Sequence, residues 1–177
     1  MSDQTTATVV DISEERPIQP WTSTDPLPSY ETRVYVMSIK AENGYMQYYF
    51  KDRPDSPDPT GDGPLTIRVP QDCTIVIKLD DAWKWEFRHE NAIMIGTSEY
   101  PDPARYFNLV QDIVDGRCMQ VQFNAQYLDQ DVVNDDPYLF YINLDQIMPD
   151  GTAAPTLAVR IDPDIRNPGD HPPIKPN

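Results

Sequence analysis

The sequence predicts an all-β protein, an antiparallel β-sandwich of seven to nine strands with an immunoglobulin-like or jelly-roll-like arrangement. Short segments carry apolar residues at every second position, which is typical of half-buried strands. Glycine, proline, asparagine and aspartate separate these segments at short intervals. The 19 prolines lie at both ends and in the connections, where a strand would not be interrupted. A small closed barrel is the alternative.

The first two strands are predicted to form a hairpin. Residues 32–40 are rich in β-branched and aromatic side chains, Asn43-Gly44 favours a type I′ turn, and residues 45–51 continue the pattern. The same alternation predicts further strands at 65–70, 73–79, 83–89, 92–95, 118–127, 138–145 and 156–162.

Two segments need a separate interpretation. In the strand at 83–89, Trp83, Trp85 and Phe87 share one face and are expected to fill the core, with the charged residues on the other face. One short helix or turn is expected near 104–114, because the apolar residues there fall at helical spacing. They are Tyr106, Leu109, Val110 and Ile113.

The chain divides into three parts. Residues 1–30 are polar and proline-containing and are expected to form a flexible N-terminal arm. Trp21 in this arm either docks, on the domain or on a neighbouring subunit, or stays on the surface. Residues 31–163 form the β-sandwich domain. Residues 164–177 form a proline-rich C-terminal tail, expected to be extended.

Charge and composition restrict the partners. The formal net charge is −15, which repels phosphate backbones and argues against nucleic acid. No segment is apolar enough for a signal peptide or a membrane span, so a cytoplasmic protein without a membrane partner is expected. Cys73 and Cys118 are expected to be reduced, although the sequence leaves a disulfide between them open.

Residues that could catalyse a reaction are few. The chain has no Gly-x-Ser-x-Gly elbow and no glycine-rich phosphate loop. His89 is interpreted as an ordinary half-exposed histidine, and His171 lies in the tail. We therefore expect no enzymatic activity and no cofactor, and the negative charge makes nucleotide chemistry unfavourable.

Two residue sets suggest ligand binding. Clustered aspartates offer the oxygen ligands that Ca²⁺ prefers, although solvated, charge-rich loops are the favoured interpretation. Aromatic side chains on strands can stack on sugars or contact proteins, and Tyr48 and Tyr141 are the surface candidates. The aspartates are Asp52, Asp55, Asp58 and Asp62 in one loop and Asp129, Asp131, Asp135 and Asp136 in another.

The end of the last predicted strand carries a short motif. Asp162-Pro163-Asp164-Ile165-Arg166-Asn167-Pro168 resembles the closing element of small bacterial proteins of the DP-EP type, some of which are labelled nucleotide synthetase. The strand leading to Trp83-Lys84-Trp85-Glu86-Phe87 is more loosely similar to inclusion-body proteins of the PixA/AidA type. The resemblance implies a compact β-sandwich without accepted catalytic residues and with a tendency to assemble.

These observations favour a non-enzymatic protein that acts by self-association or by binding another protein through its arms and strand edges. A Ca²⁺- or carbohydrate-binding module is the first alternative. A nucleotide-related enzyme is the second, and it rests on the family label alone. Whether a small molecule binds is not indicated by the sequence.

Overall fold

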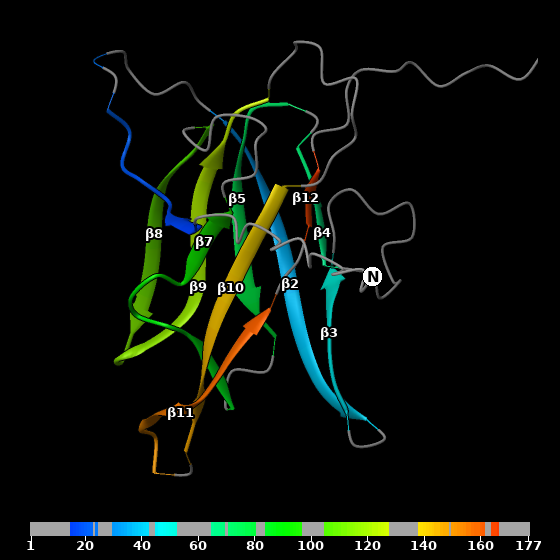
Figure 1. Cartoon of the computed structure of the whole chain (residues 1–177), viewed down its shortest axis with the longest axis vertical. Helices are drawn as coiled ribbons and strands as arrows, with labels where there is room; N and C mark the ends of the chain where they lie inside the picture. Colours follow the sequence, from blue (N-terminus) through cyan, green and yellow to red (C-terminus); the bar gives the residue numbers. More distant parts are fainter. Residues whose placement is uncertain are drawn as a thin grey trace, which may run out of the picture.

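The structure is a computed structural model of the 177-residue chain. It describes residues 15–22, 24, 30–42, 45–52, 65–69, 71–80, 84–96, 105–127, 138–148, 150–161 and 164–166. These residues form strands in two facing sheets, so the predicted β-sandwich is confirmed (Figure 1). Among them, no helix is long and apolar enough to cross a membrane.

The five-stranded sheet has the order β3-β2-β5-β9-β8. The predicted hairpin is confirmed as an antiparallel pair of β2 and β3. β5 pairs in parallel with β2 and antiparallel with β9, so the sheet is mixed rather than wholly antiparallel. The bounds are β2 Glu31–Glu42, β3 Tyr45–Asp52, β5 Cys73–Leu79, β8 Tyr106–Val114 and β9 Arg117–Ala125.

The seven-stranded sheet is built around β10, Tyr138–Ile147. β10 pairs antiparallel with β6 and β7 and also with β11 and β12, and β12 pairs in parallel with β4. β1 extends the sheet beyond β7. The bounds are β1 Glu15–Pro17, β4 Thr66–Arg68, β6 Trp85–Phe87, β7 Ile93–Gly96, β11 Ala153–Ile161 and β12 Asp164–Arg166.

The core lies between the sheets and is formed by alternate residues of their strands. The five-stranded sheet contributes Tyr35, Ile75 and Phe123, and the seven-stranded sheet contributes Phe87 and Phe140, all of them fully buried. Trp85 is buried beside Phe87, as predicted, whereas Trp83 lies outside the described residues. Burial of these large apolar side chains is the main contribution to stability.

The helix or turn expected near 104–114 is wrong, because Tyr106–Val114 forms the strand β8. Its pairing with β9 is interrupted by register shifts between Phe107 and Val110 and between Asp112 and Ile113. Asn108 has a positive φ of 57° at the first of them. At the first shift the extra residue lies in β8 and changes the phase of its side-chain alternation, so the strand shows apolar residues at spacings that resemble a helix. At the second shift the extra residue, Met119, lies in β9, and the alternation of β8 continues.

Residues 15–22 cross from one sheet to the other, and we call this segment the strap. β1 pairs with β7, Ile18 is buried in the core, and Gln19 forms a parallel bridge with Phe107 of β8. Figure 1 shows the blue strap beside these strands. The strap lies in the segment that we expected to be a flexible arm, while residues 1–14 lie outside the described residues.

Trp21 docks on the domain, one of the alternatives left open by the sequence. Its ring centroid lies 4.5 Å from that of Phe107, and its backbone N–H donates to Asn108 Oδ1 at 2.7 Å. The positive φ of Asn108 thus places a side-chain acceptor where the strap needs one. The tail predicted from residue 164 begins with the short strand β12, and residues 167–177 lie outside the described residues.

Both cysteines are free and buried, which confirms the expected reduced pair. Cys73 on β5 is level with Ala125 on β9, and Cys118 lies seven residues from Ala125 along the same strand. Seven residues of strand span about 24 Å, far more than the separation that a disulfide allows. Burial raises the pKa of Cys73 from 9.0 to about 11.

Stability at alkaline pH is therefore expected to depend on Cys73. Between pH 9 and 11 the unfolded chain ionises this thiol while the folded chain keeps it protonated, so the free energy of unfolding falls as the pH rises. Urea unfolding at pH 8, 9, 10 and 10.5 should show a smaller pH-dependent loss for Cys73→Ala than for the wild type. Parallel curves for the two proteins would contradict the raised pKa.

Candidate functional site

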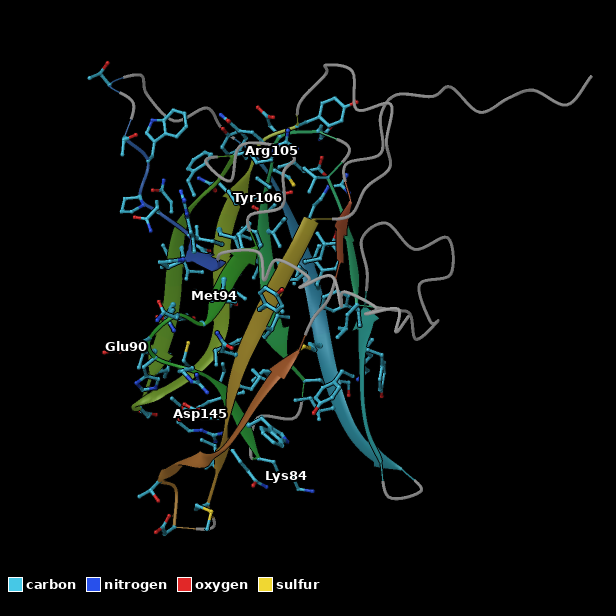
Figure 2. The ribbon with its side chains drawn as sticks, viewed as in Figure 1. Lys84, Glu90, Met94, Arg105, Tyr106 and Asp145 are labelled. Atoms are coloured by element: carbon cyan, nitrogen blue, oxygen red, sulfur yellow. The ribbon has the colours of Figure 1, made fainter. Side chains whose placement is uncertain are left out.

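A cluster of polar side chains lies where β6 and the residues after it meet β8 and β9 of the facing sheet. We call it the seam cluster. It contains Glu86, Arg88, His89, Gln111, Cys118 and Asp145. Figure 2 labels Asp145 and Glu90 near this part of the molecule, whereas Arg105 and Tyr106 lie toward its other end.

Glu86 is the buried centre of the cluster. Its side chain is only 5% exposed, although the sequence predicts it on the charged face of its strand. The backbone N–H of Cys118 donates to Glu86 Oε2 at 3.2 Å, so the facing sheet supplies a donor to the buried carboxylate. The prediction failed because Glu86 contacts the backbone of β9 instead of solvent, and strand alternation alone does not reveal contacts between distant strands.

His89 lies against the same oxygen. Its Nε2 is 3.5 Å from Glu86 Oε2, while 45% of the imidazole side chain is exposed. A carboxylate behind a histidine orients the ring and favours the tautomer with the proton on the facing nitrogen. Nδ1 is then left as the proton acceptor, so the pair can act as an acid–base group toward a molecule in solvent.

Arg88 supplies a positive charge next to this pair. Its Nε and Nη2 both donate to Asp145 Oδ1 at 3.2 Å, and its own side chain is 38% exposed. Asp145 lies directly opposite Glu86 in the pairing of β10 with β6. The guanidinium is therefore held by the Asp145 carboxylate and remains partly accessible to an anion.

The backbone of residues 88–92 is fixed from both sheets. Gln111 on β8 donates through Nε2 to the Arg88 carbonyl at 2.6 Å. Asn143 on β10 accepts from the Arg88 N–H at its carbonyl and donates through Nδ2 to the Asn91 carbonyl at 2.6 Å. Asn91 itself has a positive φ of 56°. These contacts hold Arg88 and His89 in place after β6 ends at Phe87.

Cys118 does not have the properties of a nucleophile. Burial raises the pKa of its thiol above the usual value, and hydrogen bonds from Gln111 and with the Gln120 carbonyl only partly oppose this. A thiol with a raised pKa carries little thiolate at neutral pH. Its contribution to the cluster is the backbone N–H that Glu86 accepts.

The residues predicted as binding sites do not converge on this cluster. Tyr48 on β3 is partly buried and packs against the core, where burial raises its pKa. Tyr141 is partly buried on β10 of the seven-stranded sheet, where it pairs with Met94 of the neighbouring strand β7. The two tyrosines thus lie in different sheets, and their role in binding stays a prediction.

The aspartate loops cannot be compared with the structure. Only the backbone of Asp52 is described, at the end of β3. Within the part of the chain that the structure describes, no group of three or more His, Cys, Asp or Glu side chains could hold a metal ion. The other predicted ligands lie outside the described residues: Asp55, Asp58, Asp62, Asp129, Asp131, Asp135 and Asp136.

Comparison with known families adds one result. Residues 15–170, which begin with the strap and include the whole seam cluster, match the pNTSase1 family, described as a predicted novel nucleotide synthetase. The chain belongs to this family. Membership of pNTSase1 agrees with the nucleotide synthetase label implied by the sequence motif, but it does not test the resemblance to the DP-EP or PixA/AidA types.

The pNTSase1 description points toward an enzyme and does not support the expectation of a non-enzymatic protein. No curated protein matches the chain.

Proposed function

We propose that this protein is a nucleotide-handling enzyme whose site is the seam cluster. The observation that carries the proposal is the single buried oxygen, Glu86 Oε2, which contacts both the Cys118 N–H and the exposed His89 imidazole. Buried carboxylates that orient solvent-facing histidines are typical of acid–base sites. The family description supports a nucleotide as the substrate class.

Each residue has a distinct role in this proposal. His89 accepts or donates a proton at the substrate, and Glu86 orients the ring. Arg88 binds a phosphate oxygen, and the Asp145 contact, which uses Nε and Nη2, leaves Nη1 outside that ion pair. The net charge of −15 repels phosphate at long range. At physiological ionic strength, however, salt largely screens exposed charges that lie more than about 8 Å away.

Nucleotide binding is expected to perturb His89 directly. The chain has two histidines, so ¹⁵N-histidine NMR with the wild type and His171→Asn assigns both rings. Titration with nucleoside mono-, di- and triphosphates should shift the His89 resonances. Arg88→Ala should raise the dissociation constant of the nucleotide about tenfold or more, because a charge-assisted hydrogen bond is lost.

Lys78→Ala is the matched control for the loss of one positive charge. Lys78 is exposed in the five-stranded sheet and belongs to no contact of the seam cluster. Equal weakening by Arg88→Ala and Lys78→Ala would mean that net charge alone affects binding. Unchanged His89 resonances with every nucleotide would contradict the proposed site.

Association with itself or with another protein is a second candidate, because one strand edge carries exposed apolar residues. β8 ends the five-stranded sheet, and Val110, Ile113 and Val114 on it are 49%, 49% and 60% exposed. Exposed apolar edge strands are common sites of strand addition. Light scattering after size-exclusion chromatography tests self-association. A strictly monomeric protein would exclude self-association and leave binding of another protein as the second candidate.

A further inference from the structure

Among the described residues, most of the outer edge of β8 has no pairing partner. β8 pairs with β9 on one side, and on the other side the strap forms an isolated bridge, between Gln19 and Phe107. Within the described residues, the strand from Leu109 to Val114 has no neighbour on that side. Backbone N–H and C=O groups along such an edge can pair with an added strand.

The side chains of this edge have a defined chemical pattern. Val110, Asp112 and Val114 alternate with residues of the opposite face, and all three are exposed. Next to Asp112 in the sheet lies Gln120, a neutral residue. The described residues provide no ion pair for Asp112. The pattern is therefore one acidic side chain with one apolar side chain on each side of it.

We infer that the β8 edge binds an extended segment of another protein as an added strand, with apolar residues opposite Val110 and Val114 and a lysine or arginine opposite Asp112. The inference rests on the second candidate function and names its partner class. Cross-strand apolar pairs and opposite charges both stabilise a sheet, which gives the segment its pattern of apolar, any, basic, any, apolar residues. The net charge of −15 also attracts a basic segment.

A second copy of this chain fits the same edge poorly. A twofold antiparallel pairing that places Val110 opposite Val114 of the other copy also places Asp112 opposite Asp112. Like charges directly opposite destabilise a pair of strands, and each copy carries a net charge of −15.

The experiment uses the full chain and fluorescent synthetic peptides of sequence Ser-Val-Thr-Lys-Thr-Val-Ser, measured by fluorescence anisotropy. A matched peptide carries glutamate in place of lysine. We expect the lysine peptide to bind about fivefold more tightly than the glutamate peptide, and Asp112→Lys to reverse this order. Val110→Ser should weaken the lysine peptide without reversing the order.

Two N-methylated lysine peptides test whether the peptide binds as a strand. Methylation at the second, fourth and sixth residues blocks one edge, and methylation at the third and fifth blocks the other. One peptide should bind like the parent and the other should not bind. Equal behaviour of the two, or no binding of any peptide, would overturn strand addition and with it the second candidate at this edge.

The remaining outcomes separate the partner class from the edge itself. Edge-specific binding that prefers the glutamate peptide, or that ignores Asp112→Lys, would overturn the basic partner and leave the edge as a binding site. A dimer in light scattering that Val110→Ser abolishes would show that a second copy takes the edge, and would overturn the inference. Failure of nucleotides to bind the seam cluster affects neither result, because the β8 edge side chains Val110, Asp112 and Val114 belong to no contact of that cluster.

Discussion

Replacing His89 with asparagine is expected to lower turnover of the nucleotide that binds the seam cluster by roughly 10²- to 10⁴-fold. The change removes the imidazole that accepts or donates the proton. The loss should appear in kcat rather than in KM, because the imidazole acts in the proton transfer. Steady-state kinetics with the nucleotide identified by NMR measures it.

Two variants make this result specific. His171→Asn removes the other histidine of the chain and should leave turnover unchanged. Glu86→Gln keeps an oxygen that can accept the Cys118 N–H but removes the negative charge behind the imidazole. It should lower kcat, because the ring is no longer oriented by a carboxylate. Turnover of His89→Asn within twofold of the wild type would show that the histidine is not the acid–base group.

Replacing Phe87 with alanine is expected to reduce the free energy of unfolding by about 3–5 kcal/mol. Phe87 is fully buried on β6, in the three-residue strand that also carries Glu86. The substitution removes most of an aromatic side chain from a closely packed core and leaves a cavity. A loss of this size is a large fraction of the stability of an ordinary domain. Urea unfolding followed by tryptophan fluorescence measures the change.

Phe87→Leu is the control, because it keeps most of the apolar volume and should cost less than about 1.5 kcal/mol. Val114→Ala, on the exposed edge, should change stability by no more than about 0.5 kcal/mol. If Phe87→Ala and Val114→Ala had equal effects, the packing of the two sheets around β6 would not be as described. A smaller effect of Phe87→Ala would instead mean that β6 contributes little to the cooperative core.

Much of the fold could be predicted because alternation of apolar residues reports directly on sheets with one buried face. The hairpin of β2 and β3 and the strands β5, β7 and β10 follow from such patterns. β8 could not be recognised in this way, because the bulge between Phe107 and Val110 shifts its alternation. The parallel pairing of β2 with β5 was also missed, because alternation indicates which residues face the core but not which strands are neighbours.

The seam cluster was inaccessible to sequence reasoning for a different reason. Glu86 and His89 are three residues apart, and on a continuous strand they would face opposite ways. They meet because β6 ends at Phe87, and Gln111 and Asn143 then fix the following residues from two distant strands. The alternation of aromatic and charged residues at 83–89 gave no signal that Glu86 is buried.

The strap also constrains the order in which the chain can fold. Glu15 pairs with Gly96, and Gln19 pairs with Phe107, so residues near the start of the chain find their partners about 80 to 90 positions later. During synthesis these early residues have nothing to bind until β7 and β8 have left the ribosome. Closure by the strap therefore belongs to a late stage of folding, and contacts so distant along the chain favour slow rather than rapid acquisition of the native state.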